Sequence, residues 1–165
     1  MRNNYYITTP IYYVNDKPHI GHAYTSIACD IMARFKRLDG YNVKFLTGTD
    51  EHGQKVEKAA LAQNKTPLEY ANIISKDFRA LTKTLNLSND DFIRTTEKRH
   101  KNASENLWKK LFDNNHIYLS KYSGWYALRD EAFYSEKEIT NGKAPTGAEV
   151  SWVEEESYFF DLFKW

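Results

Sequence analysis

Apolar and polar positions in the first part of the chain follow two different periods. Residues 5–14 form an apolar, β-prone run that predicts a strand. Between residues 21 and 38, apolar side chains recur every three or four positions, which predicts an amphipathic helix. Asp39-Gly40 ends this helix, because glycine readily adopts the left-handed conformation found after a helix. Residues 42–48 then predict a buried strand.

The alternation of helix and strand continues. Residues 54–63 predict a helix, and Thr66-Pro67-Leu68-Glu69 begins another, with a Thr cap and Pro in the first turn. A short strand at 91–94 precedes a long helix over 96–115. Strands joined by helices imply parallel pairing, so we expect a parallel α/β sheet. The second of these helices is expected to turn five apolar side chains inward: Leu68, Ala71, Ile74, Phe78 and Leu81.

The pattern changes after residue 116. Short aromatic-rich runs divided by Gly and Pro replace the long periodic segments. We therefore expect an α/β domain over residues 1–116 and a small β-rich appendage over 117–165. The total of 165 residues is enough for one domain with such an addition.

Composition and charge exclude several classes of protein. The single cysteine, Cys29, excludes an intrachain disulfide and a cysteine-rich metal site. A net charge of +1 gives no general attraction to nucleic acid. No apolar run approaches the length of a membrane span, and the first residues lead into a strand rather than a signal peptide. A cytoplasmic protein with no membrane partner is expected.

The first candidate site is the run Pro18-His19-Ile20-Gly21-His22, where the first strand gives way to the first helix. Two imidazoles three residues apart share one face of a helix. The positive end of the helix dipole favours an anion, so the pair suits a phosphate chain. The alternatives are a solvated turn or an adventitious metal site.

A second candidate site is the run over residues 47–53, at the carboxyl end of the second strand. In a parallel sheet this end lies on the same rim as the histidine pair. Asp50 could hold an ammonium group by a charge-assisted hydrogen bond. It could equally cap the helix that follows. Tyr13 lies near the proposed site and could wall an apolar pocket, whereas most other aromatic side chains are expected in the core of the appendage.

Taken together, these runs resemble bacterial methionyl-tRNA synthetases, a family of class I aminoacyl-tRNA synthetases. The resemblance covers essentially the whole chain and rests on five segments: residues 6–15, 18–24, 46–53, 91–97 and 156–160. It implies the first half of a Rossmann-type catalytic domain over residues 1–116. The connective-peptide insertion of the family would then occupy residues 117–165.

The resemblance also implies a reaction and its reactants. The family joins L-methionine to ATP as methionyl-adenylate and passes the methionyl group to tRNA(Met). His19, Gly21 and His22 would contact ATP, with the two imidazoles in the catalytic role, and Mg²⁺ would accompany the ATP. The methionine site would be formed by Ile11, Tyr13 and Asp50.

Two departures from the family pattern shape the expectation. Ala127 and Asp130, and then Ala144 and Gly147, stand where zinc-bearing relatives have pairs of cysteines. Zinc needs about four ligands, so we predict a zinc-free insertion held by aromatic packing. The Lys-Met-Ser-Lys-Ser loop of the family is not among the 165 residues, so only the amino-terminal part of the site is expected here.

Three functional hypotheses remain open at this stage. The chain is the amino-terminal part of a methionine–tRNA ligase, a non-catalytic fragment that binds ATP or methionine, or another nucleotidyltransferase with a His-x-Gly-His turn. Half of a doubly wound sheet also leaves an open edge. Pairing with a complementary carboxy-terminal fragment, or self-association, is therefore expected.

Overall fold

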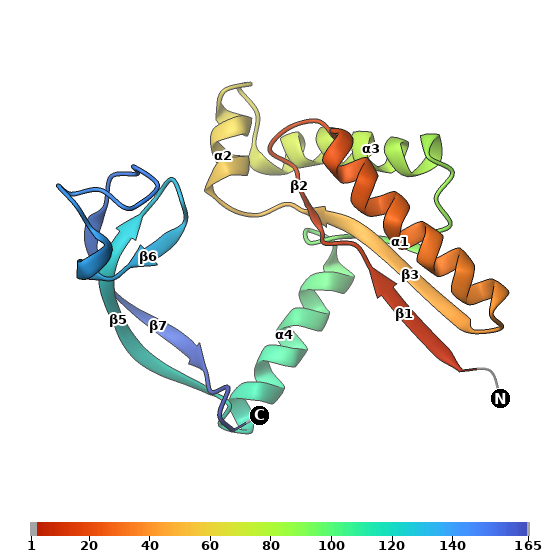
Figure 1. Ribbon diagram of the computed structural model, residues 1–165. Coiled ribbons are helices and arrows are strands. Elements are labelled where there is room, and N and C mark those ends of the chain that lie inside the picture. Colours follow the sequence, from red (N-terminus) through yellow and green to blue (C-terminus); the bar gives the residue numbers. More distant parts are fainter. Residues whose placement is uncertain (1–2, 165) are drawn as a thin grey trace. The chain divides into compact units, whose positions relative to one another are not determined.

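The computed structural model describes residues 3–164, which form two compact units divided between Ser104 and Glu105. Each unit has a sheet of its own (Figure 1). Helix α4 (Lys98–Asp113) contains the point of division.

The sheet of the first unit is parallel and is built around β3 (Asn42–Asp50). Strand β1 (Asn4–Thr8) pairs with the first part of β3, and the two run side by side in Figure 1. Strand β2 (Tyr12–Tyr13) pairs with the last residues of β3, and β4 (Asp91–Arg94) pairs with it as well. The predicted parallel α/β sheet is thus confirmed. The single strand predicted over residues 5–14 is broken in two at Pro10, which cannot donate a ladder hydrogen bond.

The remaining helices of this unit are α1 (Ile20–Leu38), α2 (Gln54–Leu61) and α3 (Pro67–Thr84). Helix α3 starts as predicted, because Thr66 Oγ1 accepts from the Glu69 amide at 3.3 Å while Glu69 Oε2 accepts from the Thr66 amide at 2.9 Å. The core packs α2 and α3 against β2 and β4. Its buried members are Tyr12, Val14, Val56, Ala60, Tyr70, Ala71, Ile74, Phe78 and Phe92.

The prediction of five inward side chains on α3 was wrong at two positions. Ala71, Ile74 and Phe78 are buried, but Leu68 is exposed and Leu81 is only half-buried. Leu68 and Leu81 lie toward the borders of the stripe that the buried residues form on the helix, so the three- and four-residue spacing placed them too close to its centre.

Helix α1 buries a different face from the one its apolar pattern predicts. The buried positions are Ser26, Asp30 and Ala33. Ile31 and Phe35, which the periodicity assigns to the apolar face, are 62% and 56% exposed. An unpartnered apolar stripe therefore runs along α1 within the part of the chain that the structure describes.

Hydrogen bonds explain why α1 turns polar side chains inward. Ser26 Oγ lies 2.8 Å from the Tyr12 hydroxyl. Asp30 Oδ1 accepts from both the amide and the hydroxyl of Ser88 at 2.6 Å, and Asp30 Oδ2 accepts from Arg34 Nε at 2.6 Å. Hydrogen bonds to these buried polar groups offset the cost of removing them from water.

The second unit contains an antiparallel sheet in the order β6-β5-β7. Strands β5 (Ile117–Ala127) and β7 (Ser151–Phe160) form a long ribbon, to which β6 (Ala132–Tyr134) adds at one end (Figure 1). A short 3₁₀ helix, η1 (Glu136–Glu138), follows β6. Aromatic pairs lie along the ribbon, including Trp125 and Trp152 with ring centroids 5.4 Å apart.

The turns beyond the ribbon are held by small side chains and one carboxylate. Ala127, Ala144 and Ala148 form a buried cluster. Beside it, the carboxylate of Asp130 accepts from the hydroxyls of Thr146 and Tyr134, the latter at 3.0 Å. In both units, none of the described helices is long and apolar enough to cross a membrane.

Replacing Asp30 with Asn tests the polar face of α1. Burial alone would raise the pKa of the Asp30 carboxyl, but hydrogen bonds from Ser88 and the Arg34 guanidinium bring it below the usual 3.8. Its charged form therefore stabilises the fold above pH 3.8, and this contribution is lost as the pH falls through the lowered pKa. We expect Asp30→Asn to reduce the free energy of unfolding by about 1–3 kcal/mol at pH 7, and the deficit to shrink below pH 4.

Urea denaturation at pH 7 and at pH 3 measures both effects. Asp39→Asn is the matched control, since Asp39 pairs with Lys36 at the exposed end of the same helix. Its cost should stay within about 0.5 kcal/mol. A deficit for Asp30→Asn that is the same at both pH values would contradict the assignment.

Candidate functional site

The two candidate runs lie at the carboxyl ends of paired parallel strands. In the register of β2 and β3, Tyr12 is opposite Thr49 and Tyr13 is opposite Asp50. Helix α1 begins a few residues after β2. Ligands of open α/β sheets bind outside this end of the strands.

The two histidines form a reciprocal cap at the start of α1. His19 is the N-cap residue, and its Nδ1 accepts from the Gly21 amide at 3.1 Å. His22 Nδ1 accepts from the His19 amide at 3.1 Å. Pro18 therefore precedes the cap and lies outside the helix.

This cap fixes the tautomer of both rings. Each Nδ1 accepts from a backbone N–H, so in the neutral imidazole the proton is on Nε2. The ring centroids are 3.9 Å apart. The start of α1 thus offers two adjacent N–H donors.

Gly21 is what lets the His19 ring fold back over the helix. A Cβ at Gly21 would lie 3.0 Å from Cε1 and 3.1 Å from Nδ1 of His19. These contacts are tighter than side chains normally allow, so another residue here would displace the ring. The space next to the Gly21 Cα is occupied by the imidazole of His19.

His22 is wedged between aromatic side chains. Its ring meets those of Tyr12 and Phe78 edge-on, at centroid distances of 4.8 and 5.0 Å. Burial lowers the pKa of His22 from its usual 6.5, and the neighbouring charge of His19 lowers it further. At neutral pH the ring is therefore an uncharged donor.

Asp50 does not cap the next helix. The N-cap of α2 is Gly53, with no side-chain hydrogen bond, and Asp50 Oδ1 accepts a long hydrogen bond from the His52 amide at 3.5 Å. The Tyr13 hydroxyl lies over the same turn, because a Cβ at Gly53 would come within 3.3 Å of it. Ile11, just before β2, is 41% exposed and is available to a ligand.

Tyr12 connects the two candidate runs. Its ring contacts His22, and its backbone pairs with Thr49, next to Asp50. The structure therefore brings the histidine pair, Tyr13 and Asp50 to one rim of the sheet, as the parallel topology requires.

Sequence reasoning missed Glu51 and Arg94 at this rim. Glu51 follows β3 directly, and both of its carboxylate oxygens accept from the guanidinium of Arg94 at 2.7 and 2.9 Å. The available signal was a pair of opposite charges at the carboxyl ends of two strands. That signal becomes visible only once β3 and β4 are known to be neighbours.

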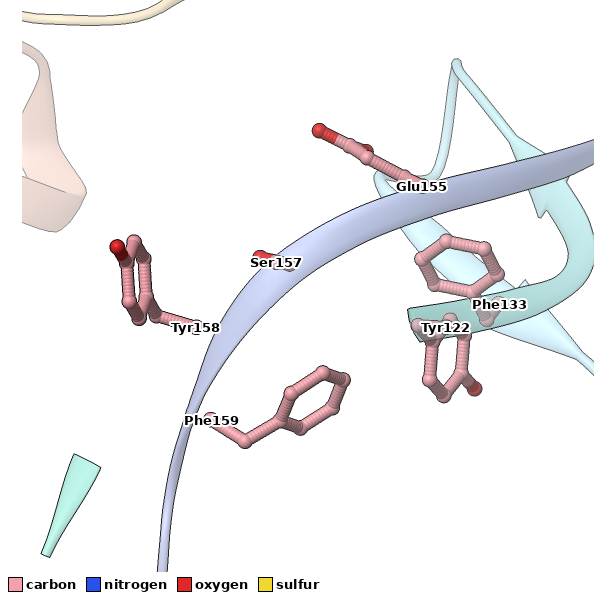
Figure 2. A pocket seen from close by; sticks show the side chains of 6 residues that line it. All are labelled: Tyr122, Phe133, Glu155, Ser157, Tyr158 and Phe159. Atoms are coloured by element: carbon pink, nitrogen blue, oxygen red, sulfur yellow. The ribbon is translucent and has the colours of Figure 1, made fainter. Parts of the chain in front are cut away.

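A separate hollow of about 270 Å³ lies on the ribbon of the second unit (Figure 2). The rings of Tyr122, Phe133 and Phe159 lie close to one another there, with Glu155 nearby. Glu155 is its only charged lining residue, and no predicted site residue lines it. Over residues 3–164, no three His, Cys, Asp or Glu side chains are grouped closely enough to hold a metal ion.

Comparison with known proteins shows the family of the chain. The family described as tRNA synthetases class I (M) matches residues 5–162. Methionine–tRNA ligases from Rickettsia felis and Bacillus subtilis are 64% and 52% identical to the chain, over 100% and 99% of its length. The chain covers only 32% and 26% of those two proteins.

A solved structure is similar over nearly the whole chain. Methionyl-tRNA synthetase of Mycobacterium tuberculosis in complex with methionyl-adenylate has a TM-score of 0.85 and 49% identity, covering 97% of this chain and 32% of that one. The chain thus spans about a third of the length of this relative. The family match, which covers almost every residue and includes both candidate runs, shows that the chain belongs to the class I (M) tRNA synthetases.

Proposed function

We propose that the chain carries the ATP- and methionine-binding part of a methionine–tRNA ligase. The enzyme would activate L-methionine as methionyl-adenylate and transfer it to tRNA(Met). The observation that carries the proposal is the pair of Nε2–H donors at the start of α1, joined through Tyr12 to the strand that presents Asp50. The names of the relatives and the methionyl-adenylate in the similar structure support it.

The histidine pair is the ATP side of the proposed site. In adenylation, a carboxylate oxygen of methionine attacks the α-phosphorus, the bond to the bridging oxygen breaks, and pyrophosphate leaves. The protein need only position the reactants and stabilise the charge on the phosphate oxygens. His19 and His22 would donate from Nε2, with Gly21 holding the first ring in place. Mg²⁺ would enter with ATP as part of the substrate.

Asp50, Tyr13 and Ile11 are the methionine side. The carboxylate of Asp50 would accept from the ammonium group of the amino acid. Tyr13 pairs with Asp50 in the register and is 40% exposed, so its ring can line a neighbouring pocket. Ile11 would add an apolar wall from the loop before β2.

Residues 1–116 would form the first half of the catalytic domain, and residues 117–165 the connective-peptide insertion. We propose that this insertion needs no zinc. The side chains at the expected ligand positions do not suit the metal, since Ala127 and Ala144 are buried methyl groups. The Asp130 carboxylate is engaged by Thr146, Tyr134 and Arg129.

A binding fragment without catalysis is the second candidate. It corresponds to the 165 residues by themselves, which span 32% of the similar synthetase and contain no Lys-Met-Ser-Lys-Ser run. A nucleotidyltransferase outside the synthetases is not favoured, because the family match spans both candidate runs and the second unit.

Reciprocal variants test the proposed site. We expect Asp50→Asn to weaken L-methionine binding by about 10- to 100-fold, the value of a charge-assisted hydrogen bond, while ATP binding is kept. His19→Ala should weaken ATP binding and leave methionine binding intact. Isothermal titration of each ligand into each variant measures the crossed pattern.

A wild-type chain that binds neither ligand would contradict the proposal. So would equal losses of both ligands in both variants. Methionine-dependent exchange between ATP and pyrophosphate then separates the two candidates, since a binding fragment gives crossed binding effects without exchange.

The state of the two imidazoles gives a pH prediction. His22 should titrate with a midpoint below 6.5, and protonation of Nδ1 would displace the His19 amide. Because the unfolded state takes up this proton more readily, the fold loses stability as the pH falls below 6.5. His19→Ala removes the smaller of the two causes, so the midpoint should rise but stay below 6.5.

Nitrogen-15 NMR titration reports both the midpoint and the Nε2–H tautomer. Ile20→Ala is the control, since this exposed side chain lies in the same helical turn and should leave the midpoint unchanged. A midpoint of 6.5 or above, or an Nδ1–H tautomer at neutral pH, would refute the arrangement.

The outer edge of β1 gives a prediction about association. In the described sheet, β1 pairs with β3 on one side and forms an edge on the other. An open edge invites pairing with a second chain or a complementary fragment, and Lys on an edge strand discourages it. We expect the chain to self-associate and Tyr6→Lys to reduce this. Sedimentation velocity compares this variant with Tyr24→Lys, the same change on exposed α1, and a monodisperse monomeric wild type would refute it.

A further inference from the structure

Glu51 is a charged side chain with no role in the proposed site, although it lies between Asp50 and His52. Its side chain is fully buried, with 0% exposed. A carboxylate removed from water is costly unless it is paired and hydrogen-bonded. The groups that pair with this buried carboxylate therefore decide whether it is tolerated at the rim.

Glu51 is satisfied on both oxygens. Oε1 accepts from Arg94 Nε at 2.7 Å and from the Thr49 hydroxyl at 2.7 Å. Oε2 accepts from the second guanidinium nitrogen at 2.9 Å and from the hydroxyl of Thr96. The fork of Arg94 fits both oxygens at once, which fixes the carboxylate in direction as well as in place.

The same contacts tie three segments together. Arg94, at the end of β4, also donates to Asn72 on α3 at 2.7 Å. The Glu51 amide donates to the Thr95 hydroxyl at 2.9 Å, and His52 Nε2 lies 3.4 Å from the Thr95 carbonyl oxygen. The turn after β3 is therefore anchored to the turn after β4.

This anchor decides which face Asp50 presents. Successive side chains on a strand point to opposite faces, so Thr49 and Asp50 are on opposite sides of β3. Glu51 is bonded to Thr49 and is thus held on the side away from Asp50. With the residues on both sides of it fixed, the backbone of Asp50 has little freedom to rotate.

We propose that Glu51 and Arg94 are a positioning pair that holds Asp50 in place to receive the ammonium group of L-methionine. This inference rests on the proposed function and adds two residues to it. Arg94 also cancels the charge of Glu51, so the attraction for an ammonium group is concentrated at Asp50. Neither member of the pair contacts the substrate.

Arg94→Lys tests the pair, since it keeps the charge but removes the fork. Arg99→Lys is the matched control, because Arg99 makes the same bidentate contact with Asp91 at 2.6 and 3.0 Å at the other end of β4. Three quantities are measured for each chain: the affinity for L-methionine by NMR titration, the affinity for ATP, and the exchange rates of the backbone amides of residues 50–52.

We expect Arg94→Lys to weaken methionine binding by about 10- to 100-fold, as displaced binding groups do, with ATP binding within about twofold of wild type. Exchange of the Glu51 amide should become faster. Arg99→Lys should change neither methionine binding nor that exchange, even if both variants melt earlier. Methionine binding that is unchanged in Arg94→Lys, or equally weakened in Arg99→Lys, overturns the proposal.

The test also gives an answer if the variant does not fold or if the unaltered chain does not bind L-methionine. If Arg94→Lys does not fold, the neutral double variant Glu51→Gln with Arg94→Gln replaces it, with the same expected loss and the same contradicting result. If the unaltered chain binds no L-methionine, the proposed function fails while the exchange rates still judge the pair. Unchanged exchange at residues 50–52 then overturns the positioning role, and faster exchange supports it.

Discussion

The pairing of β3 with a strand on each side is the constraint on which the first unit depends. β1 and β2 lie along one side and β4 along the other, and Gly48 allows the close approach of β4. A Cβ at Gly48 would lie 2.1 Å from the carbonyl oxygen of Ile93, so no larger residue fits without separating the strands. The site residues follow from this pairing, because they end β3 or follow the short strand beside it.

Features that depend on neighbouring residues could be predicted from the sequence. Thr66 and Glu69 are three residues apart, as are His19 and His22, and the structure contains both arrangements. The rim shared by the histidine pair and Asp50 was also predictable, because parallel strands place their carboxyl ends together. The resemblance to a family added the chemical roles, which spacing alone left open.

Features that depend on distant partners could not be predicted. The inward face of α1 is set by Ser88, which lies 58 residues after Asp30 in the chain. Without that partner, Asp30 is an ordinary surface acid and the apolar stripe is the natural choice for burial. Glu51 and Arg94 are 43 residues apart and pose the same difficulty. A local sequence pattern shows that burying a charged side chain would be costly, but it does not show which distant residue compensates the charge.

Charge is arranged at this rim in three different ways. Glu51 is buried and its charge is cancelled by Arg94, so in the proposed site it would position the backbone rather than bind a ligand. The pKa of His22 is lowered from its usual value, so at neutral pH its Nε2–H is a donor on an uncharged ring. Asp50 lies on the face opposite to Thr49 and Glu51. The proposed binding of an amino acid and a nucleotide would use this separation, with a negative group for the ammonium and N–H donors for the phosphates. An uncompensated charge on Glu51 would instead oppose the approach of a phosphate chain, so pairing with Arg94 keeps the negative charge of the rim at Asp50.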